Sequence, residues 1–267
     1  MKRMVCTIGI GLLLIGTAAA GETVVSTHAV LGEFAEAVGG EALDTVNLIP
    51  SGFCPAHYDL SPSDLAAVLN ASVVLYSGLE PWMDTLLDAI GSDAVVLQLP
   101  GSWSTPDAAV EKVETIRDAL IERFPDNADT FTANTAAYVE ALRSLAQTLN
   151  ARAASADVSS IPVVCMAWQA DFVSWLGFDI VATYGAPEAL SLQDLAQLAD
   201  EGRTAGARLV VDNLQSGVGF GAKLAHEIGA IHVVLSNFPG PMPRTPTVLD
   251  LFAQNAEALF SAVGPAK

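Results

Sequence analysis

Short β-branched runs alternating with amphipathic helical segments are the feature that most constrains this fold. The eight runs that predict strands are Thr23–Ser26, Thr45–Ile49, Ser72–Tyr76, Ala94–Leu97, Pro162–Met166, Asp179–Thr183, Arg208–Asp212 and Ile231–Leu235. Between the first two runs, Leu31, Phe34, Ala35 and Val38 follow the i, i+3, i+4, i+7 spacing of a helix. This alternation predicts an α/β fold with mostly parallel sheets, whose strands end at a ligand crevice.

The alternation of strands and helices is interrupted in the middle of the chain by a long stretch that has no strand pattern. One helix is predicted over Pro106–Phe124 and a second, longer one from about Ala128 to Arg152. A flexible hinge would be rich in glycine and serine, and this stretch is not. We expect residues 127–153 to form a rigid linker helix between an N-terminal α/β lobe, residues 21–126, and a C-terminal α/β lobe, residues 154–267. The ligand crevice would lie between the two lobes.

The first twenty residues have the pattern of an export signal. Lys2 and Arg3 precede an apolar run over residues 8–15, and small residues end at Ala20. The apolar run is too short to span a bilayer as a stable anchor. No cysteine follows it closely, so the sequence gives no sign of a lipid anchor. We expect residues 1–20 to be a signal peptide cleaved near Ala20, and the mature protein to be periplasmic.

The chain is strongly acidic. It holds 30 acidic and 12 basic residues, a formal net charge of −18 at pH 7. Such a surface repels nucleic acid and anionic membranes, and it attracts cations. We therefore expect no nucleic-acid partner. We also expect a monomer.

A loop after the second predicted strand brings together residue types that bind metals. Cys54, His57 and Asp59 lie within six residues of one another. A helix entry follows at once, with Ser61 as the N-cap and Asp64 positioned to complete a capping box. Because that entry pins the end of the loop, the thiol and the imidazole can be held in fixed positions.

Several segments along the chain carry a family resemblance. They are Thr27-His28-Ala-Val-Leu, Leu48-Ile-Pro-Ser-Gly, Tyr58-Asp59, Pro62-Ser63-Asp64, Gly78-Leu79-Glu80-Pro81-Trp82, Ala167-Trp168 and the tail Leu249–Leu259. Together with the two lobes and the linker helix, they resemble the metal-binding receptors of zinc and manganese ABC importers. The resemblance implies a protein that captures a divalent ion between its lobes and delivers it to a membrane permease.

The resemblance also implies four metal ligands, and this chain departs from that set. Placed without gaps, the four ligand positions fall at Ala56, Gly101, Cys165 and Ser236. The only nearby imidazole is that of His57, one position after Ala56. The usual set of histidines and carboxylates is therefore absent, which leaves open whether the cargo is a bare metal ion.

Four residues with metal-binding side chains remain at strand ends or in crevice loops, and they form the ligand set that we predict: His57, Cys54, Cys165 and His28. Two imidazoles and two thiolates suit zinc or cuprous copper and suit manganese or magnesium poorly. We expect a transition metal ion as cargo, with zinc favoured over copper, iron or nickel.

Several alternatives stay open. The two cysteines could be small buried hydrophobes or could form a disulfide across the crevice, and His28 could be a core histidine. The protein could also carry a metal complex or a small organic solute instead of a bare ion. Finally, Cys54 or Cys165 with His57 could serve an extracytoplasmic enzyme. We expect no enzyme, because the sequence lacks an oxyanion-hole motif and a nucleophile elbow.

Overall fold

The computed structural model describes residues 22–88, 90 and 93–264, and the predicted signal peptide lies outside these residues. Two four-stranded sheets form the centres of two lobes, in the orders β2-β1-β3-β4 and β6-β5-β7-β8, and every strand pair is parallel. The strands are β1 Glu22–His28, β2 Leu43–Ile49, β3 Val73–Tyr76, β4 Val95–Gln98, β5 Pro162–Met166, β6 Asp179–Tyr184, β7 Leu209–Asn213 and β8 Ile231–Leu235. The eight predicted strands and the α/β class are thus confirmed.

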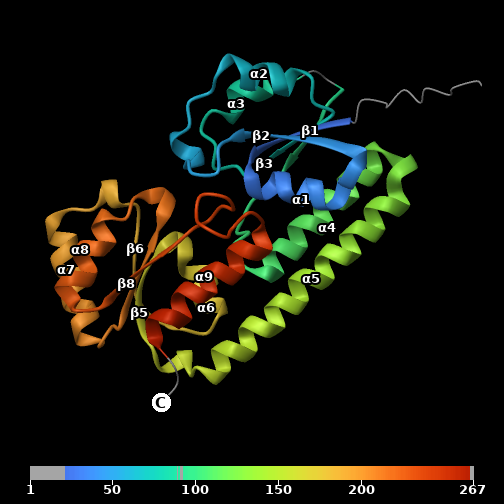
Figure 1. Ribbon diagram of the computed structural model, residues 1–267. Helices are drawn as coiled ribbons and strands as arrows, with labels where there is room; N and C mark the ends of the chain where they lie inside the picture. Colours follow the sequence, from blue (N-terminus) through green and yellow to red (C-terminus); the bar gives the residue numbers. More distant parts are fainter. Residues whose placement is uncertain (1–21, 89, 91–92, 265–267) are drawn as a thin grey trace, which may run out of the picture.

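Helices cover the sheets and connect successive parallel strands (Figure 1). They are α1 Ala29–Gly39, α2 Pro62–Leu69, α3 Met83–Leu87, α4 Pro106–Arg123, α5 Ala128–Ser155, α6 Ala170–Trp175, α7 Leu192–Thr204, α8 Gly219–Ile228 and α9 Val248–Val263. The capping box predicted at the start of α2 is present. Asp64 N donates to Ser61 Oγ at 3.3 Å, and Ser61 N donates to Asp64 Oδ2 at 2.7 Å. This reciprocal pair fixes the point where the Cys54 loop enters the helix.

Helix α5 runs along one side of the molecule and reaches both lobes (Figure 1). Its 28 residues give it a length of about 42 Å. Phe131 and Leu142 on this helix are fully buried, in one continuous core with Phe34 of the first lobe and Phe252 of the second. Burying each such side chain contributes roughly 1.5–3 kcal/mol. Because both lobes share this core with α5, large independent movements of the lobes would expose it.

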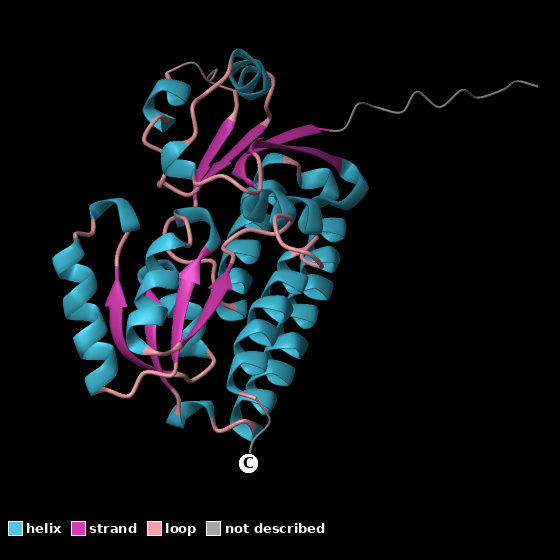
Figure 2. Ribbon diagram, turned by 60° about the vertical axis from the view of Figure 1, so that its left-hand side comes forward, coloured by secondary structure: helices cyan, strands magenta, loops and turns pink. Residues whose placement is uncertain are grey.

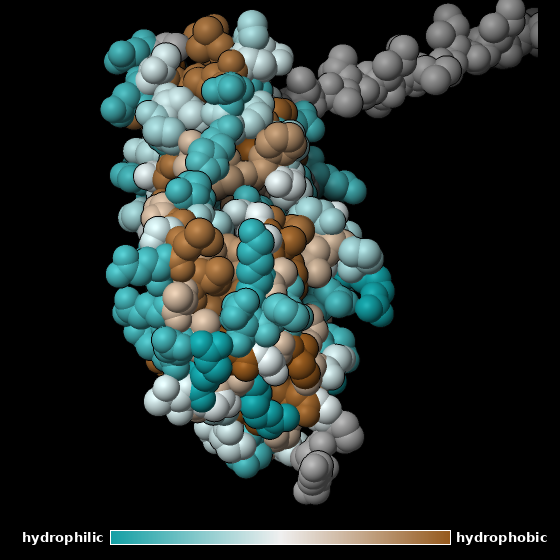
Figure 3. Space-filling view, turned by 90° about the vertical axis from the view of Figure 1, so that its left-hand side faces the viewer, coloured by the Kyte–Doolittle hydropathy of each residue, from teal (hydrophilic) through white to brown (hydrophobic). Residues whose placement is uncertain are grey.

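The carboxyl ends of the second sheet's strands point toward the first lobe (Figure 2). This orientation places the loops after β5, β7 and β8 opposite the loops after β2, β3 and β4. On the face shown in Figure 3, hydrophobic residues lie in separate patches among hydrophilic ones. Within the described residues, no helix combines the length and apolarity needed to cross a membrane.

Candidate functional site

A cavity of about 410 Å³ lies between the lobes and is lined by residues of both. The loops after β2, β3 and β4 contribute Cys54, Ser77 and Trp103 from the first lobe. All three loops follow the carboxyl ends of parallel strands, where crevices form in α/β sheets. Of the described residues that line the cavity, only Cys54 and Asp171 carry ionisable side chains. The cavity wall is therefore mostly neutral.

Carboxamide and hydroxyl groups of Asn213, Gln215, Ser216 and Asn237, on the loops after β7 and β8, line the cavity from the second lobe and form what we call the carboxamide wall. Gln169, on the loop after β5, does not line the cavity but supports this wall. Gln169 Nε2 donates to Asn237 Oδ1 at 2.7 Å, and Asn237 N donates to Gln215 Oε1 at 3.1 Å. Asn213 Oδ1 accepts from both the backbone nitrogen and the hydroxyl of Ser216, at 2.9 and 3.0 Å. Each side chain is oriented by the next, so the wall presents fixed hydrogen-bonding groups.

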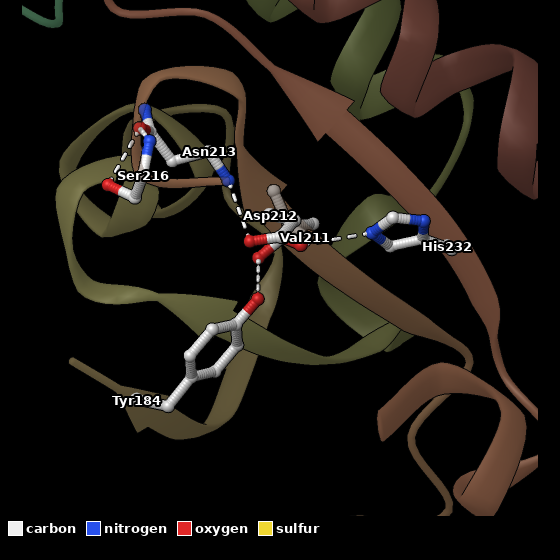
Figure 4. A network of polar contacts seen from close by, with 6 residues as sticks. All are labelled: Tyr184, Val211, Asp212, Asn213, Ser216 and His232. Carbon is white, nitrogen blue, oxygen red and sulfur yellow. Dashed lines mark hydrogen bonds and ion pairs between the residues drawn. The ribbon is translucent and has the colours of Figure 1, made fainter. Parts of the chain in front are cut away.

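A second network lies directly behind this wall (Figure 4). The Asp212 carboxylate is fully buried; its Oδ2 lies 3.2 Å from His232 Nε2, and its Oδ1 accepts the Asn213 backbone N–H at 2.9 Å. Tyr184 donates its hydroxyl to Val211 O at 3.2 Å. Burial raises the pKa of the Tyr184 phenol, and the negative charge of Asp212 raises it further. The network holds the end of β7 in place and so positions Asn213.

Aromatic rings form the part of the cavity wall where the lobes meet. Trp103 Nε1 of the first lobe donates to Asn237 O of the second at 3.2 Å. The Trp103 and Phe238 rings, which both line the cavity, lie 5.9 Å apart. On the opposite lobe, half of the Trp168 surface is exposed, at 50%. The cavity therefore combines flat apolar walls with neutral polar groups.

His28, a predicted ligand, lies behind these rings and does not line the cavity. Its ring centroid is 4.6 Å from that of Trp103 and 5.3 Å from that of Phe238. Neither ring nitrogen has a hydrogen-bond partner among the described residues. Burial lowers the pKa of His28 to about 4, although the charge of Glu80 acts in the opposite direction. The imidazole is therefore neutral at physiological pH and packs as a core side chain.

Cys54 and Cys165 are both free, so the disulfide alternative is not formed. Cys165 is fully buried in β5, and its Sγ donates to Met166 O at 3.4 Å. Burial, and then the charge of Asp212, raises its pKa, which keeps it a thiol. Cys54 is half-buried and lines the cavity. Of the two thiols, only that of Cys54 faces the space where a cargo fits.

His57 lies outside the residues that line the cavity. Its side chain is 69% exposed, and its Nε2 lies 3.9 Å from Glu188 Oε1 of the second lobe. The structure therefore brings Cys54 to the cavity and holds His28, His57 and Cys165 elsewhere. Among residues 22–88, 90 and 93–264, no group of three or more His, Cys, Asp or Glu side chains could hold a metal ion.

The carboxamide wall was not identified from the sequence. Asn213, Gln215 and Asn237, and the supporting Gln169, each follow a predicted strand by one to three residues. This position after a strand could have indicated a binding site, because side chains that follow parallel strands gather at one edge of the sheet. The rule holds for carboxamides as it does for metal ligands.

The fold is shared with solved structures of metal-binding proteins. A Mn-bound periplasmic metal-binding protein from Candidatus Liberibacter asiaticus superposes with a TM-score of 0.82 at 18% identity, over 91% of this chain and 100% of the other. A crystal structure of ZnuA superposes with a TM-score of 0.75 at 21% identity, over 89% and 98% of the two chains. At these identities the likeness concerns the fold.

Curated relatives match parts of the chain. The manganese-binding lipoprotein MntA of Halalkalibacterium halodurans is 32% identical over 49% of this chain and 50% of its own length. The zinc-binding lipoprotein AdcA of Streptococcus pneumoniae is 30% identical over 46% of this chain and 31% of its own. The iron-binding protein YfeA of Yersinia pestis is 27% identical over 48% of each. The chain thus spans half or less of the length of these relatives.

The model of one family covers nearly the whole chain. That family is described as ZnuA, zinc-uptake complex component A, periplasmic, and its model matches residues 24–262. The match includes both sheets, α5 and every segment that lines the cavity. The chain therefore belongs to the ZnuA family of metal-binding periplasmic substrate-binding proteins of ABC importers, whose members are transport proteins and not enzymes.

Proposed function

We propose that this protein is the receptor of an ABC importer for a transition metal, that it works in the periplasm, and that it delivers its cargo to a membrane permease. The observation that carries the proposal is the cavity of about 410 Å³ between the lobes. Loops at the carboxyl ends of strands in both sheets line it. A cargo held there contacts both lobes at once, so binding can be signalled to a permease that touches both.

Cys54 is the residue that we propose to contact the metal directly. A thiolate is a ligand that zinc and cuprous copper prefer and that manganese uses rarely. The relatives are named for manganese, zinc and iron. On the chemistry of the thiol we favour zinc. The exposed His57 and the buried Cys165 and His28 take no part in this proposed site.

Elemental analysis tests the proposal. Protein isolated from the periplasm without chelator is expected to contain about one transition metal ion per chain. Cys54→Ser is expected to lose most of that metal. Cys165→Ser is the matched control, because it makes the same change at a buried thiol outside the cavity, and it is expected to keep the metal. Absence of metal from the unmodified protein would overturn the proposal.

A further inference from the structure

The cavity is larger than a single metal ion, and few of its described lining residues carry ionisable side chains. Resting on the proposed function, we propose that the metal enters this cavity as a small uncharged chelate, with one coordination position left for Cys54. The organic part of the chelate would contact the carboxamide wall and the aromatic rings.

The ligand chemistry of the cavity is the first argument. A protein site for bare zinc supplies three or four thiolate, imidazole or carboxylate ligands. The described lining offers one thiol, Cys54, and one carboxylate, Asp171. Amide and hydroxyl groups do not neutralise a divalent ion or replace its anionic ligands. The missing donor atoms must therefore arrive with the cargo.

The size of the cavity is the second argument. At roughly 30 Å³ per water molecule, its 410 Å³ corresponds to the volume of about 14 waters. This volume falls within the range of roughly 300–1,000 Å³ that is typical of small-molecule sites. A single ion at a bond length of about 2.3 Å from Cys54 would leave most of that space filled with water.

The wall offers specific contacts to an organic guest. The carboxamides of Asn213, Gln215 and Asn237 are already oriented by hydrogen bonds with their neighbours, so they lose little entropy when they bind. Among the described residues, the side-chain nitrogen of Asn237 has no partner, and it can donate to a chelator's oxygen. The rings of Trp103 and Trp168 supply flat apolar surface for the chelator's carbon skeleton.

The charge of the chain limits the charge of the chelate. The formal net charge is −18 at pH 7, and Asp171 adds a carboxylate at the cavity itself. An anionic chelate, such as a metal citrate, would approach against this field. A neutral chelate meets no such repulsion, and its polar atoms can pair with the carboxamides.

Native mass spectrometry of protein from the periplasm, with elemental analysis of the same sample, tests this inference. The expected adduct is one metal ion together with an organic molecule of roughly 150–400 Da, the size class that such a cavity holds. A bare metal ion alone would overturn the inference and leave the proposed function standing. An organic molecule without metal would overturn the proposed metal cargo as well, and protein that carries neither would contradict both.

Two substitutions link the adduct to the wall. Gln215→Leu removes two hydrogen-bonding groups at nearly constant size and is expected to lower occupancy of the adduct by about tenfold. Ser216→Ala is a milder change for the case in which Gln215→Leu does not fold, and it is expected to lower occupancy severalfold. His57→Ala is the control, outside the cavity, and is expected to change nothing. Loss of the adduct in His57→Ala with retention in both wall variants would overturn the assignment.

Discussion

The carboxylate of Glu33 accepts the backbone N–H of Val248 through both oxygens, at 2.8 and 2.7 Å. Glu33 lies on α1 of the first lobe, and Val248 is the first residue of α9 in the second. Tyr138 of α5 donates its hydroxyl to the same carboxylate at 2.9 Å. One side chain therefore joins the first lobe, the long helix and the C-terminal helix. Burial, as the largest cause, raises the pKa of Glu33 to about 7.

This pKa predicts how stability varies with pH. Between pH 4.5 and about 7 the folded state keeps the Glu33 proton that the unfolded chain releases. The free energy of unfolding therefore falls as pH rises through this window, by up to about 3 kcal/mol from this group. Glu33→Gln is expected to remove that part of the slope in urea unfolding at pH 5, 6, 7 and 8. Glu41→Gln, an exposed carboxylate in the same lobe, should keep it; equal slopes in both variants would contradict the account.

His28 predicts an unusual outcome for the loss of a histidine. Both of its buried ring nitrogens lack partners among the described residues, and unpaired buried polar groups cost free energy. His28→Phe keeps a ring beside Trp103 and Phe238. We expect the free energy of unfolding to stay equal or to rise by about 1 kcal/mol, with metal content unchanged. Loss of metal in a folded His28→Phe protein would restore His28 as a ligand.

The two thiols should differ in reactivity. Cys54 is half-buried beside the cavity, whereas Cys165 is fully buried and its pKa is raised. In the folded, cargo-free protein, iodoacetamide is expected to label Cys54 and to leave Cys165 unlabelled. Bound cargo should slow the labelling of Cys54 by at least tenfold. Peptide mass spectrometry after timed labelling measures both rates, and labelling of Cys165 first would show that the buried position is wrong.

The network behind the carboxamide wall depends on a close approach at Gly221. A Cβ added there would overlap Asp212 Oδ2 and would lie 2.8 Å from the Tyr184 hydroxyl. Gly221→Ala is therefore expected to lower the free energy of unfolding by about 1–3 kcal/mol and to weaken cargo binding. Gly219→Ala, two positions earlier at the first residue of α8, is the matched control, because a Cβ added there meets nothing within 4 Å. Thermal unfolding of the two variants should separate them, and equal melting temperatures would argue against the packing described.

The fold could be predicted from the sequence because the local hydrophobic patterns of this chain match the strands and helices that its tertiary structure contains. The strand run at Pro162–Met166 and the helical stretch that became Ala128–Ser155 both lie where the pattern places them. The division into residues 21–126, 127–153 and 154–267 stays a prediction. The site was harder to predict, because a pattern does not tell which way a side chain turns. Cys54 lies in the loop after β2 and Cys165 lies near the end of β5, yet only Cys54 lines the cavity.

The carboxamide wall illustrates the same limit. Asn213 and Gln215 are common turn residues, and their sequence positions alone do not distinguish a turn from a binding surface. Only the tertiary placement of the loops after β5, β7 and β8 joins them with Asn237 into one network. Glu33 could not be identified either, since its partner Val248 lies 215 positions along the chain.

The position of the metal is the most direct test of the central claim. Anomalous X-ray scattering from crystals of cargo-loaded protein would locate the ion without assuming its ligands. The account predicts one peak inside the cavity between the lobes, about 2.3 Å from Cys54 Sγ if the metal is zinc. A peak bonded to Cys165 or His28, or one on the surface remote from the cavity, would contradict it.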